Sequence, residues 1–364
     1  MKNNIKIIDL FAGCGGFSCG FQKAGFDISI AVEFEDMIAT SYLANHKNTK
    51  MIIDDIKNVD NKNIFSVGDA DIIIGGPPCQ GFSMAGARIR GGFIEDPRNY
   101  LFKHYFNIVK IVQPKIFILE NVKGILTLKN GDIINEIKKS FENIGYKIQY
   151  KVIRVRDFGI PQARERVIII GSLYDFNLDN EIEKTIKNIS KIDKNFFLST
   201  TVFDAISNLP KPTEDGIVEN LTYVSKYQKF LSAKDNTTYN HIATKHNDIA
   251  TDRIKKIQIN ENYTVLDENI KSVHSGSYGR LDPNGIAPTI TTRFDTPSGG
   301  KFIHPIENRT ITPREAARIQ SFPDDFVFHG TKTNICKQIG NAVPPKLAYF
   351  LAILTKDIIK NYGK

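Results

Sequence analysis

The chain has 364 residues, of which 41% are hydrophobic and 24% are charged, the composition of a globular protein with room for two domains. Its net charge of +8 favours a polyanionic partner. No apolar run reaches the ~18–20 residues that a membrane span needs, so we expect no membrane contact. No signal peptide precedes the first strand-like segment, which favours a cytoplasmic location. The four cysteines lack C-x-x-C spacing and no H-E-x-x-H occurs, so we expect neither a metal site nor a disulfide framework.

The first half of the chain alternates between strand-like and helix-like segments. Apolar, β-branched runs predict strands at 5–10, 28–33, 51–55, 70–75, 115–121, 147–155 and 166–172. Helical patterns lie between them at 16–24, 36–46, 98–112 and 132–144. Several strands are continuously apolar, which is typical of strands covered on both faces. The alternation predicts an α/β fold with a doubly wound, mostly parallel sheet, whose ligands bind at the carboxyl ends of the strands.

The second half is less regular. Turn signals and short strand-like pieces fill residues 210–310. A helix is predicted at 312–321, where Thr312, Pro313 and Glu315 match a capping box with proline at the first helical position. A last helix is predicted from about 345 to 361. We expect residues 1–178 and 333–364 to form a catalytic and cofactor-binding domain, and 179–332 a smaller, irregular domain for target recognition.

A glycine-rich turn, DLFAGCGGF at residues 9–17, follows the first strand and opens a helix. Its glycines let the backbone approach a ligand closely, and they are Gly13, Gly15 and Gly16. A dinucleotide-binding G-x-G-x-x-G pattern fails here, because Ser18 occupies the third glycine position.

Acidic residues follow the next two strands. Glu33 ends the second strand, where a carboxylate can accept both hydroxyls of a ribose. Asp55 and Ile56 follow the third strand, where a carboxylate can accept the amino group of an adenine and an apolar side chain can cover its face. Together with the glycine turn, these residues predict a cofactor that contains adenosine.

A second rigid loop, GGPPCQGFS at 75–83, follows the fourth strand. A free cysteine is usually a small buried hydrophobe, and we interpret Cys14, Cys19 and Cys336 in that way. Cys79 differs, because Pro77 and Pro78 fix the loop that aims it. A thiolate nucleophile needs nearby positive charge, for which the candidates are Arg88, Arg90, Arg98, Arg164 and Arg166.

At this loop the chain resembles the bacterial DNA cytosine-C5 methyltransferase family, which uses S-adenosylmethionine. The similar segments occur in the family's order: 9–17, 75–83, Glu120-Asn121-Val122, QARER at 162–166, RIQSFP within 314–323, and GNAVPP at 340–345. They span nearly the whole chain, and the resemblance is weak only at about 175–300.

The resemblance implies a covalent mechanism. Carbon 5 of cytosine becomes nucleophilic when the thiolate of Cys79 adds to carbon 6. Protonation of ring N3 requires a carboxylic acid, which the resemblance assigns to Glu120. Arg164 and Arg166 are the remaining catalytic candidates, and family likeness places Arg164 nearer the base. The implied S-adenosylmethionine contacts are Phe11, Gly13, Gly15, Gly16, Glu33, Phe34, Asp55, Ile56, Leu101, Asn341 and Val343.

The implied substrate is duplex DNA, from which the target base must be flipped out before it can react. Residues after the nucleophile loop are candidates to hold the flipped backbone, and small hydroxyls with arginines suit phosphate and guanine contacts in the second domain. The candidate DNA contacts are Ser83, Arg88, Arg98, Gln162, Arg280, Thr291 and Arg293. We expect a monomer that works beside a restriction endonuclease.

Rival functions differ in the features they require. The broken glycine fingerprint disfavours a nicotinamide-dependent oxidoreductase. Methyltransferases of exocyclic amines place an aromatic residue where this chain has Cys79. A transfer-RNA cytosine-C5 methyltransferase shares the motifs and stays an alternative. A catalytically inactive DNA-binding relative also stays open, although it should lack one of Cys79, Glu120 and Arg164, and all three are present.

Overall fold

The computed structural model describes residues 5–61, 64–78, 100–268, 270 and 275–363, and the chain forms two compact units. Unit 1 comprises Met1–Arg154, Glu165–Asp193 and Leu347–Lys364, and unit 2 comprises Val155–Arg164 and Lys194–Lys346. This division differs from the expected one at three places. Residues 155–164 and 333–346 belong to unit 2, and residues 179–193 belong to unit 1.

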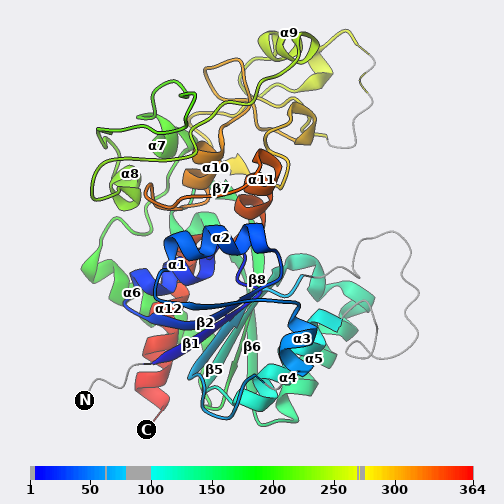
Figure 1. Ribbon diagram of the computed structural model, residues 1–364, viewed down its shortest axis with the longest axis vertical. Helices are drawn as coiled ribbons and strands as arrows, with labels where there is room; N and C mark the ends of the chain where they lie inside the picture. Colours follow the sequence, from blue (N-terminus) through cyan, green and yellow to red (C-terminus); the bar gives the residue numbers. More distant parts are fainter. Residues whose placement is uncertain (1–4, 62–63, 79–99, 269, 271–274, 364) are drawn as a thin grey trace. The chain divides into compact units, whose positions relative to one another are not determined.

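A seven-stranded sheet forms the centre of unit 1 (Figure 1), in the order β3-β2-β1-β4-β5-β8-β6. The four pairs from β3 to β5 are parallel, whereas β8 runs antiparallel to both β5 and β6. The predicted α/β fold with a mostly parallel sheet is therefore confirmed. The strands are β1 (Lys6–Leu10), β2 (Asp27–Glu33), β3 (Lys50–Ile53), β4 (Ile72–Gly75), β5 (Ile116–Val122), β6 (Lys147–Arg154) and β8 (Glu165–Ser172).

Helices cover both faces of this sheet, with α3, α4 and α5 on one side and α1, α2 and α12 on the other (Figure 1). A hydrophobic core of unit 1 lies where α3, α4 and α5 pack on the strands, and its aromatic members include Phe102, Tyr105, Phe117 and Phe141. Because both faces are covered, a strand such as β4 is buried along its whole length. The helices are α1 (Gly16–Lys23), α2 (Asp36–Asn45), α3 (Ile56–Asn61), α4 (Tyr100–Val112), α5 (Asp132–Glu142), α6 (Leu178–Ile192) and α12 (Pro345–Tyr362).

Helix α6 explains why residues 179–193 belong to unit 1. Asn177 caps it by accepting a hydrogen bond from the backbone of Asn180. One turn later, Glu181 is fully buried and accepts hydrogen bonds from Asn361 and Tyr362 of α12. Such a buried carboxylate needs these partners, so α6 and α12 are tied together.

Unit 2 has little regular structure. Its short strands β7 (Gln162–Ala163) and β9 (Ala287–Pro288) pair in parallel, which explains why residues 155–164 belong to this unit. Its helices are α7 (Val202–Ile206), α8 (Lys226–Leu231), α9 (Asp248–Lys256), α10 (Pro313–Ile319) and α11 (Lys332–Asn341). Among the described residues, no helix is long and apolar enough to span a membrane.

Helix α10 is buried along its whole length, and it begins with the predicted capping box of Thr312 and Glu315. Arg309 donates two hydrogen bonds to Glu315, each 2.8 Å long, and His304 Nε2 lies 3.5 Å from the same carboxylate. Burial opposes the charge of Glu315, but the hydrogen bonds and charge of Arg309 outweigh it and lower the pKa of this carboxyl to about 2.

We predict that Glu315 makes unit 2 sensitive to acid. Its folded pKa lies below its ordinary value of 4.5, so the stabilisation is complete above that value and is lost as the pH falls toward 2. Glu315→Gln should lower the free energy of unfolding at pH 7 by about 3 kcal/mol, because the charge of Arg309 stays buried without this partner. The variant should also lose less stability than the parent between pH 5 and pH 3, measured by urea unfolding.

Glu307→Gln is the matched control, because Glu307 binds the same arginine from a more exposed position. This substitution should lower the free energy of unfolding by less than about 1 kcal/mol. An unchanged pH dependence in Glu315→Gln would show that this carboxylate does not carry the effect.

Candidate active site

The glycine turn connects β1 to α1, and its backbone explains its composition. Gly13 and Gly15 both have left-handed φ angles, of 56° and 95°. A Cβ on Gly15 would lie 2.1 Å from His46 Nε2, whereas a Cβ on Gly13 would meet nothing within 4 Å. Phe11 also has a positive φ, of 59°, which costs a non-glycine residue energy and often marks a functional site. The open space over Gly13 leaves its backbone accessible to a ligand.

Glu33 ties the end of β2 to this turn. Its Oε2 accepts a hydrogen bond from the backbone N–H of Gly13 at 2.9 Å, and its Oε1 accepts one from Glu35 at 2.9 Å. Burial raises the pKa of Glu33, although its backbone hydrogen bonds act in the opposite direction. The carboxylate predicted to bind a ribose therefore lies directly beside the glycine turn.

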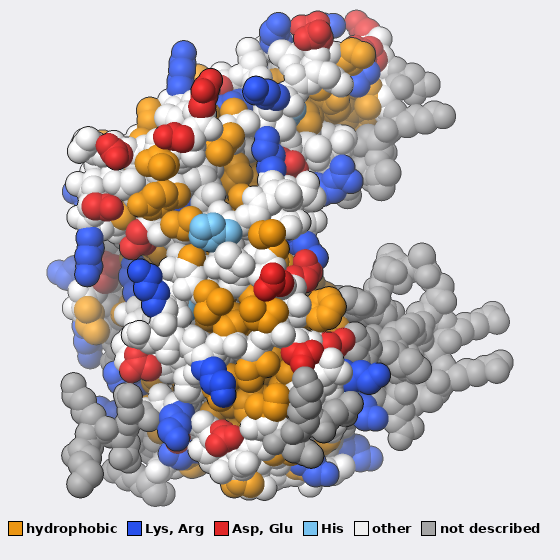
Figure 2. All heavy atoms as spheres, viewed as in Figure 1, with side chains coloured by type: hydrophobic (Ala, Val, Ile, Leu, Met, Phe, Trp, Pro, Cys, Tyr) orange, Lys and Arg blue, Asp and Glu red, His pale blue; other side chains and the backbone are white. Residues whose placement is uncertain are grey.

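Two further cofactor candidates differ in exposure. Phe34 is 67% exposed, and Figure 2 shows hydrophobic side chains beside acidic ones over the part of unit 1 that carries β2 and α2. Ile56, in contrast, is only 3% exposed and belongs to the core. The aromatic ring of Phe34 is thus an apolar surface at the end of β2. The predicted contact of Ile56 with an adenine stays a prediction.

The other cofactor candidates of unit 1 lie at the carboxyl side of the strands or on α4. Asp55 follows β3 and accepts a hydrogen bond from the backbone N–H of Lys57 at 2.9 Å. Asp54 binds the side chain of Asn58. Leu101 is partly buried and packs against the core.

A buried carboxyl beneath the glycine turn was missed by the sequence reasoning. Asp9 is 1% exposed and accepts a 2.6 Å hydrogen bond from Ser18, whose hydroxyl lies 2.8 Å from that of Tyr42. Burial raises the pKa of Asp9 to about 7. An aspartate at the end of an apolar strand was the available signal. The three side chains join β1, α1 and α2 behind the turn.

The loop after β4 rests on the end of β5. Glu120 Oε2 lies 3.2 Å from the position that a Cβ on Gly76 would occupy. Asn121 donates a hydrogen bond of 3.2 Å to the carbonyl of Pro77. Parallel strands end at one edge of a sheet, and β4 pairs with β5, so Glu120 and Asn121 hold the segment that leads to residue 79. Cys79, Ser83, Arg88 and Arg98 themselves lie outside the described residues.

Arg166 forms an ion pair with Glu120, with 2.9 Å between Nε and Oε1. The pairing follows from the register, because Val122 faces Arg166 and Glu120 faces Ile168 across β5 and β8. All four side chains therefore lie on one face, and both charged ones are largely buried.

Arg164 lies in a different environment, in unit 2. It is 2% exposed, and its guanidinium donates to the carbonyls of Gly340 at 2.9 Å and Ala342 at 3.2 Å. The arginine found beside Glu120 is thus Arg166, whereas the expectation placed Arg164 nearer the base. The physical reason is that β8 begins at Glu165. Arg166 therefore lies in the sheet beside β5, whereas Arg164 precedes the strand and belongs to unit 2.

Gln162 does not match its predicted role in DNA contact. It is completely buried. Its side chain accepts a hydrogen bond from Ile290 at 3.0 Å and donates one to Gln320 at 2.8 Å. The side-chain oxygen and the side-chain nitrogen of Gln162 therefore both form hydrogen bonds inside unit 2.

Arg280 also contradicts the expected DNA contact. Its five N–H groups all donate inside unit 2, and the side chain is 6% exposed. The acceptors are the carbonyls of Ile254, Ile257, His304 and Glu307 and the side chain of Asn308. No donor remains for a phosphate or a guanine.

The other candidates in unit 2 have varied exposure. Thr291, Arg293 and Asn341 are exposed, and Val343 is 8% exposed. Their predicted contacts with DNA or cofactor stay predictions. Among the described residues, no group of three or more His, Cys, Asp or Glu side chains is arranged to hold a metal ion.

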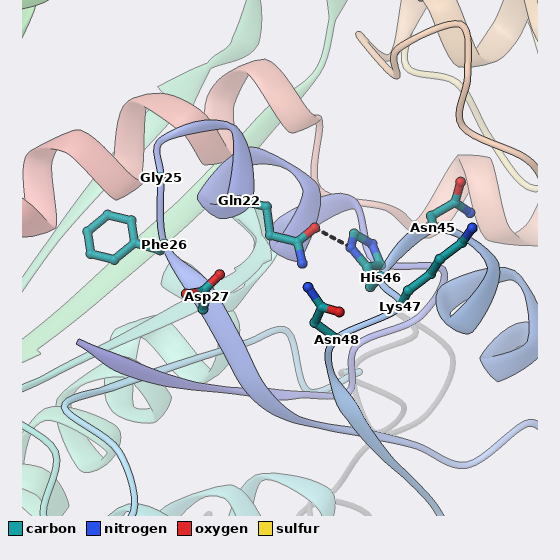
Figure 3. A pocket seen from close by; sticks show the side chains of 8 residues that line it. All are labelled: Gln22, Gly25, Phe26, Asp27, Asn45, His46, Lys47 and Asn48. Atoms are coloured by element: carbon teal, nitrogen blue, oxygen red, sulfur yellow. Dashed lines mark hydrogen bonds between the residues drawn. The ribbon is translucent and has the colours of Figure 1, made fainter. Parts of the chain in front are cut away.

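A pocket of about 440 Å³ lies elsewhere in unit 1 (Figure 3). Gln22 and His46 point toward each other in it, joined by a hydrogen bond of 2.6 Å. It lies near the beginning of β2, away from the strand ends that carry Glu33 and Glu120, so we assign it no part in the reaction. It is lined by Gln22, Gly25, Phe26, Asp27, Asn45, His46, Lys47 and Asn48.

Comparisons with known proteins identify the family of the chain. A family model described as C-5 cytosine-specific DNA methylase matches residues 5–357. The chain is 37% identical to the Type II methyltransferase M.DdeI of Desulfomicrobium norvegicum, over 96% of this chain and 88% of that protein. It is 35% identical to the Type II methyltransferase M.FnuDI of Fusobacterium nucleatum, over 99% of this chain and 96% of that protein.

Solved structures with a similar fold include two methyltransferases. The chain resembles a prophage-encoded E. coli protein described as a DNA modification methyltransferase, with a TM-score of 0.73 and 28% identity over 98% of this chain and 100% of that one. The Dnmt2 methyltransferase of S. pombe shares the fold, with a TM-score of 0.62 and 15% identity over 98% of each chain.

We predict that Arg280 is important for the stability of the fold and that Arg293 is not. Arg280→Met should lower the free energy of unfolding by about 3 kcal/mol, because several buried carbonyls lose a charged donor. Arg293→Met should change it by less than about 0.5 kcal/mol, because that side chain is exposed. Urea unfolding of both variants checks this, and equal losses would contradict the structural role of Arg280.

Proposed function

The chain belongs to the C-5 cytosine-specific DNA methylase family, and from this premise we propose that it methylates carbon 5 of a flipped-out cytosine within a specific duplex DNA sequence. The observation that best supports the proposal is the position of Glu120. This carboxyl lies against Gly76 and is paired with Arg166, beside the loop that continues to Cys79. A proton donor that lies against the segment preceding a nucleophilic cysteine in the sequence suits the addition of a thiolate to cytosine.

S-adenosylmethionine, when bound, supplies an electrophilic methyl group. The described residues suit an adenosine-containing molecule. The left-handed glycines leave open space at Gly13, Glu33 presents its carboxylate beside that backbone, and Phe34 exposes a ring for stacking. We propose these three, with Asp55 after β3, as the principal cofactor contacts of unit 1. Asn341 and Val343 are proposed as contacts from unit 2.

The chain's own residues perform the activation of the base. The thiolate of Cys79 adds to carbon 6, and the carboxylic acid of Glu120 gives its proton to ring N3, so that carbon 5 becomes nucleophilic. After methylation, water takes the proton from carbon 5 and the bond from carbon 6 to sulfur breaks, which restores the thiolate. Ring N3 then returns its proton to the carboxylate of Glu120. Arg166 holds Glu120 in position and keeps positive charge next to the reacting base.

Recognition of DNA is proposed for exposed groups of unit 2, above all Thr291 and Arg293, and for Ser83, Arg88 and Arg98 near the nucleophile. The target base must leave the helical stack, because carbon 6 cannot otherwise reach the thiolate and carbon 5 cannot reach the methyl donor. Relatives at 35–37% identity are named Type II methyltransferases. We therefore propose that this protein acts as a monomer in the cytoplasm and protects DNA from a restriction endonuclease.

The covalent mechanism predicts trapping by 5-fluorocytosine. Duplex DNA that carries this base at the target should form a stable adduct with the protein and S-adenosylmethionine, because fluorine cannot leave carbon 5 as a proton does. The target is first located by bisulfite sequencing of methylated DNA. Denaturing electrophoresis and mass spectrometry then detect the adduct, which Cys79→Ala should abolish.

Cys19→Ala is the control for that experiment, since it removes another thiol, one outside the proposed site. It should leave adduct formation intact. Methylation of DNA without any adduct would contradict the thiolate route, and absence of cytosine methylation by the parent protein would contradict the proposed function.

The ion pair of Arg166 with Glu120 predicts a loss confined to catalysis. Arg166→Met should lower kcat by about 100-fold, because proton transfer by a misplaced acid is lost. The dissociation constant for S-adenosylmethionine should change less than threefold. Lys123→Met is the control, because Lys123 and Glu165 form an exposed ion pair next to the same two strands. A kcat within threefold of the parent in Arg166→Met would contradict the assigned role.

A further inference from the structure

We propose that Gln162 and Arg164 are positioning residues that couple two segments of unit 2, one at 289–293 and the other at 339–343. These segments carry the proposed DNA contacts Thr291 and Arg293 and the proposed cofactor contacts Asn341 and Val343. The inference rests on the proposed function for the roles of these contacts. The coupling itself rests on hydrogen bonds within unit 2.

The first connection runs through two buried amides. Gln162 accepts the backbone N–H of Ile290, the residue directly before Thr291, and donates to the side chain of Gln320. Gln320 in turn donates to the carbonyl of Ile339 at 2.7 Å. Both glutamines are completely buried, so neither can exchange these partners for water without local opening.

The second connection runs through Arg164. Its Nη1 donates to Gly340, and its Nη2 donates to Ala342. These are the carbonyls directly before Asn341 and Val343. The same Nη1 also lies 3.5 Å from the carbonyl of Ile290, as a long hydrogen bond. A buried guanidinium presents its donors in a fixed plane, so the three carbonyls cannot shift independently.

Direct packing joins the same two segments. A Cβ on Gly340 would lie 2.5 Å from the carbonyl oxygen of Thr291 and 2.8 Å from the backbone nitrogen of Thr292. The backbone of the first segment therefore rests on a glycine of the second. The neighbouring strand pair of β7 with β9, and a hydrogen bond of 3.1 Å from Thr289 to the carbonyl of Ala163, fix the segment that carries both positioning residues.

This arrangement has a functional consequence. A change in the position of residues 339–343, where we place cofactor contacts, must be accommodated at residues 289–293, where we place DNA contacts. Occupancy of the cofactor site is thereby linked to the geometry that selects DNA. Reciprocity requires that cognate DNA affect cofactor affinity by the same factor.

Hydrogen exchange tests the coupling without requiring activity. In Gln162→Met and in Arg164→Met, peptides covering 289–293 and 339–343 should both exchange at least about fivefold faster than in the parent, because buried hydrogen bonds are lost. Arg164→Lys keeps the charge but reaches fewer carbonyls, so it should give a smaller change in both peptides. If Gln162→Met affected only the first peptide and Arg164→Met only the second, the coupling would be disproved.

Arg280→Met is the matched control. It removes another buried arginine of unit 2 that donates to carbonyls. These carbonyls belong to His304 and Ile254, outside the two coupled segments. Its faster exchange should appear at 254–259 and 303–308. Faster exchange at 289–293 and 339–343 in this variant, to the same degree as in Arg164→Met, would show general loosening of unit 2 and overturn the proposal.

Binding and turnover provide the functional measurement. Arg164→Met should raise the dissociation constant for S-adenosylmethionine, measured by calorimetry, and lower the ratio of kcat/KM between the preferred DNA and single-base variants, each by about fivefold. Arg280→Met at a temperature of equal folded fraction should change neither by more than twofold. Unchanged discrimination in Arg164→Met would overturn the link to DNA selection.

A parent protein that binds S-adenosylmethionine but does not methylate cytosine would refute the proposed function. The hydrogen-exchange result would still decide whether the two segments are coupled.

Discussion

The parallel alignment of β2, β1, β4 and β5 brings the ends of four strands to one edge of the sheet, and the contacts of the candidate site depend on it. Glu33 reaches back to Gly13 because β1 and β2 end together. Glu120 lies against Gly76 because β4 and β5 end together. The glycine turn and the loop that follows β4 are thus brought to the same edge by the sheet register, with β1 and β4 as neighbours. Ligand sites in doubly wound sheets generally arise in this way.

Arginine serves two distinct purposes in this protein. In unit 1, Arg166 holds the carboxyl group of Glu120 in position through a contact of 2.9 Å. In unit 2, Arg164, Arg280 and Arg314 donate mainly to backbone carbonyls. Unit 2 has few strands and short helices, so many of its carbonyls have no partner in regular structure. Buried guanidinium groups satisfy several carbonyls at once, which makes an irregular backbone stable.

Buried acids show a parallel division. Glu315 stays charged because Arg309 donates a hydrogen bond to each of its two carboxylate oxygens, and this buried pair fixes the start of α10. Asp9 has no cation among its described partners, and burial raises its pKa to about 7. The first acid stabilises unit 2 through charge, whereas the second supports the glycine turn through hydrogen bonds to Ser18 and onward to Tyr42.

The sequence by itself determined the seven strands of the sheet, the glycine turn, the capping box at Thr312 and the family, because these depend on local periodicity and on residue types at fixed spacing. It did not determine which arginine meets Glu120, or that Gln162 and Arg280 are buried. Those outcomes depend on the register of β5 against β8 and on which carbonyls an irregular backbone leaves without partners. An arginine that binds DNA and one that binds carbonyls have the same side chain, so only the tertiary structure distinguishes them.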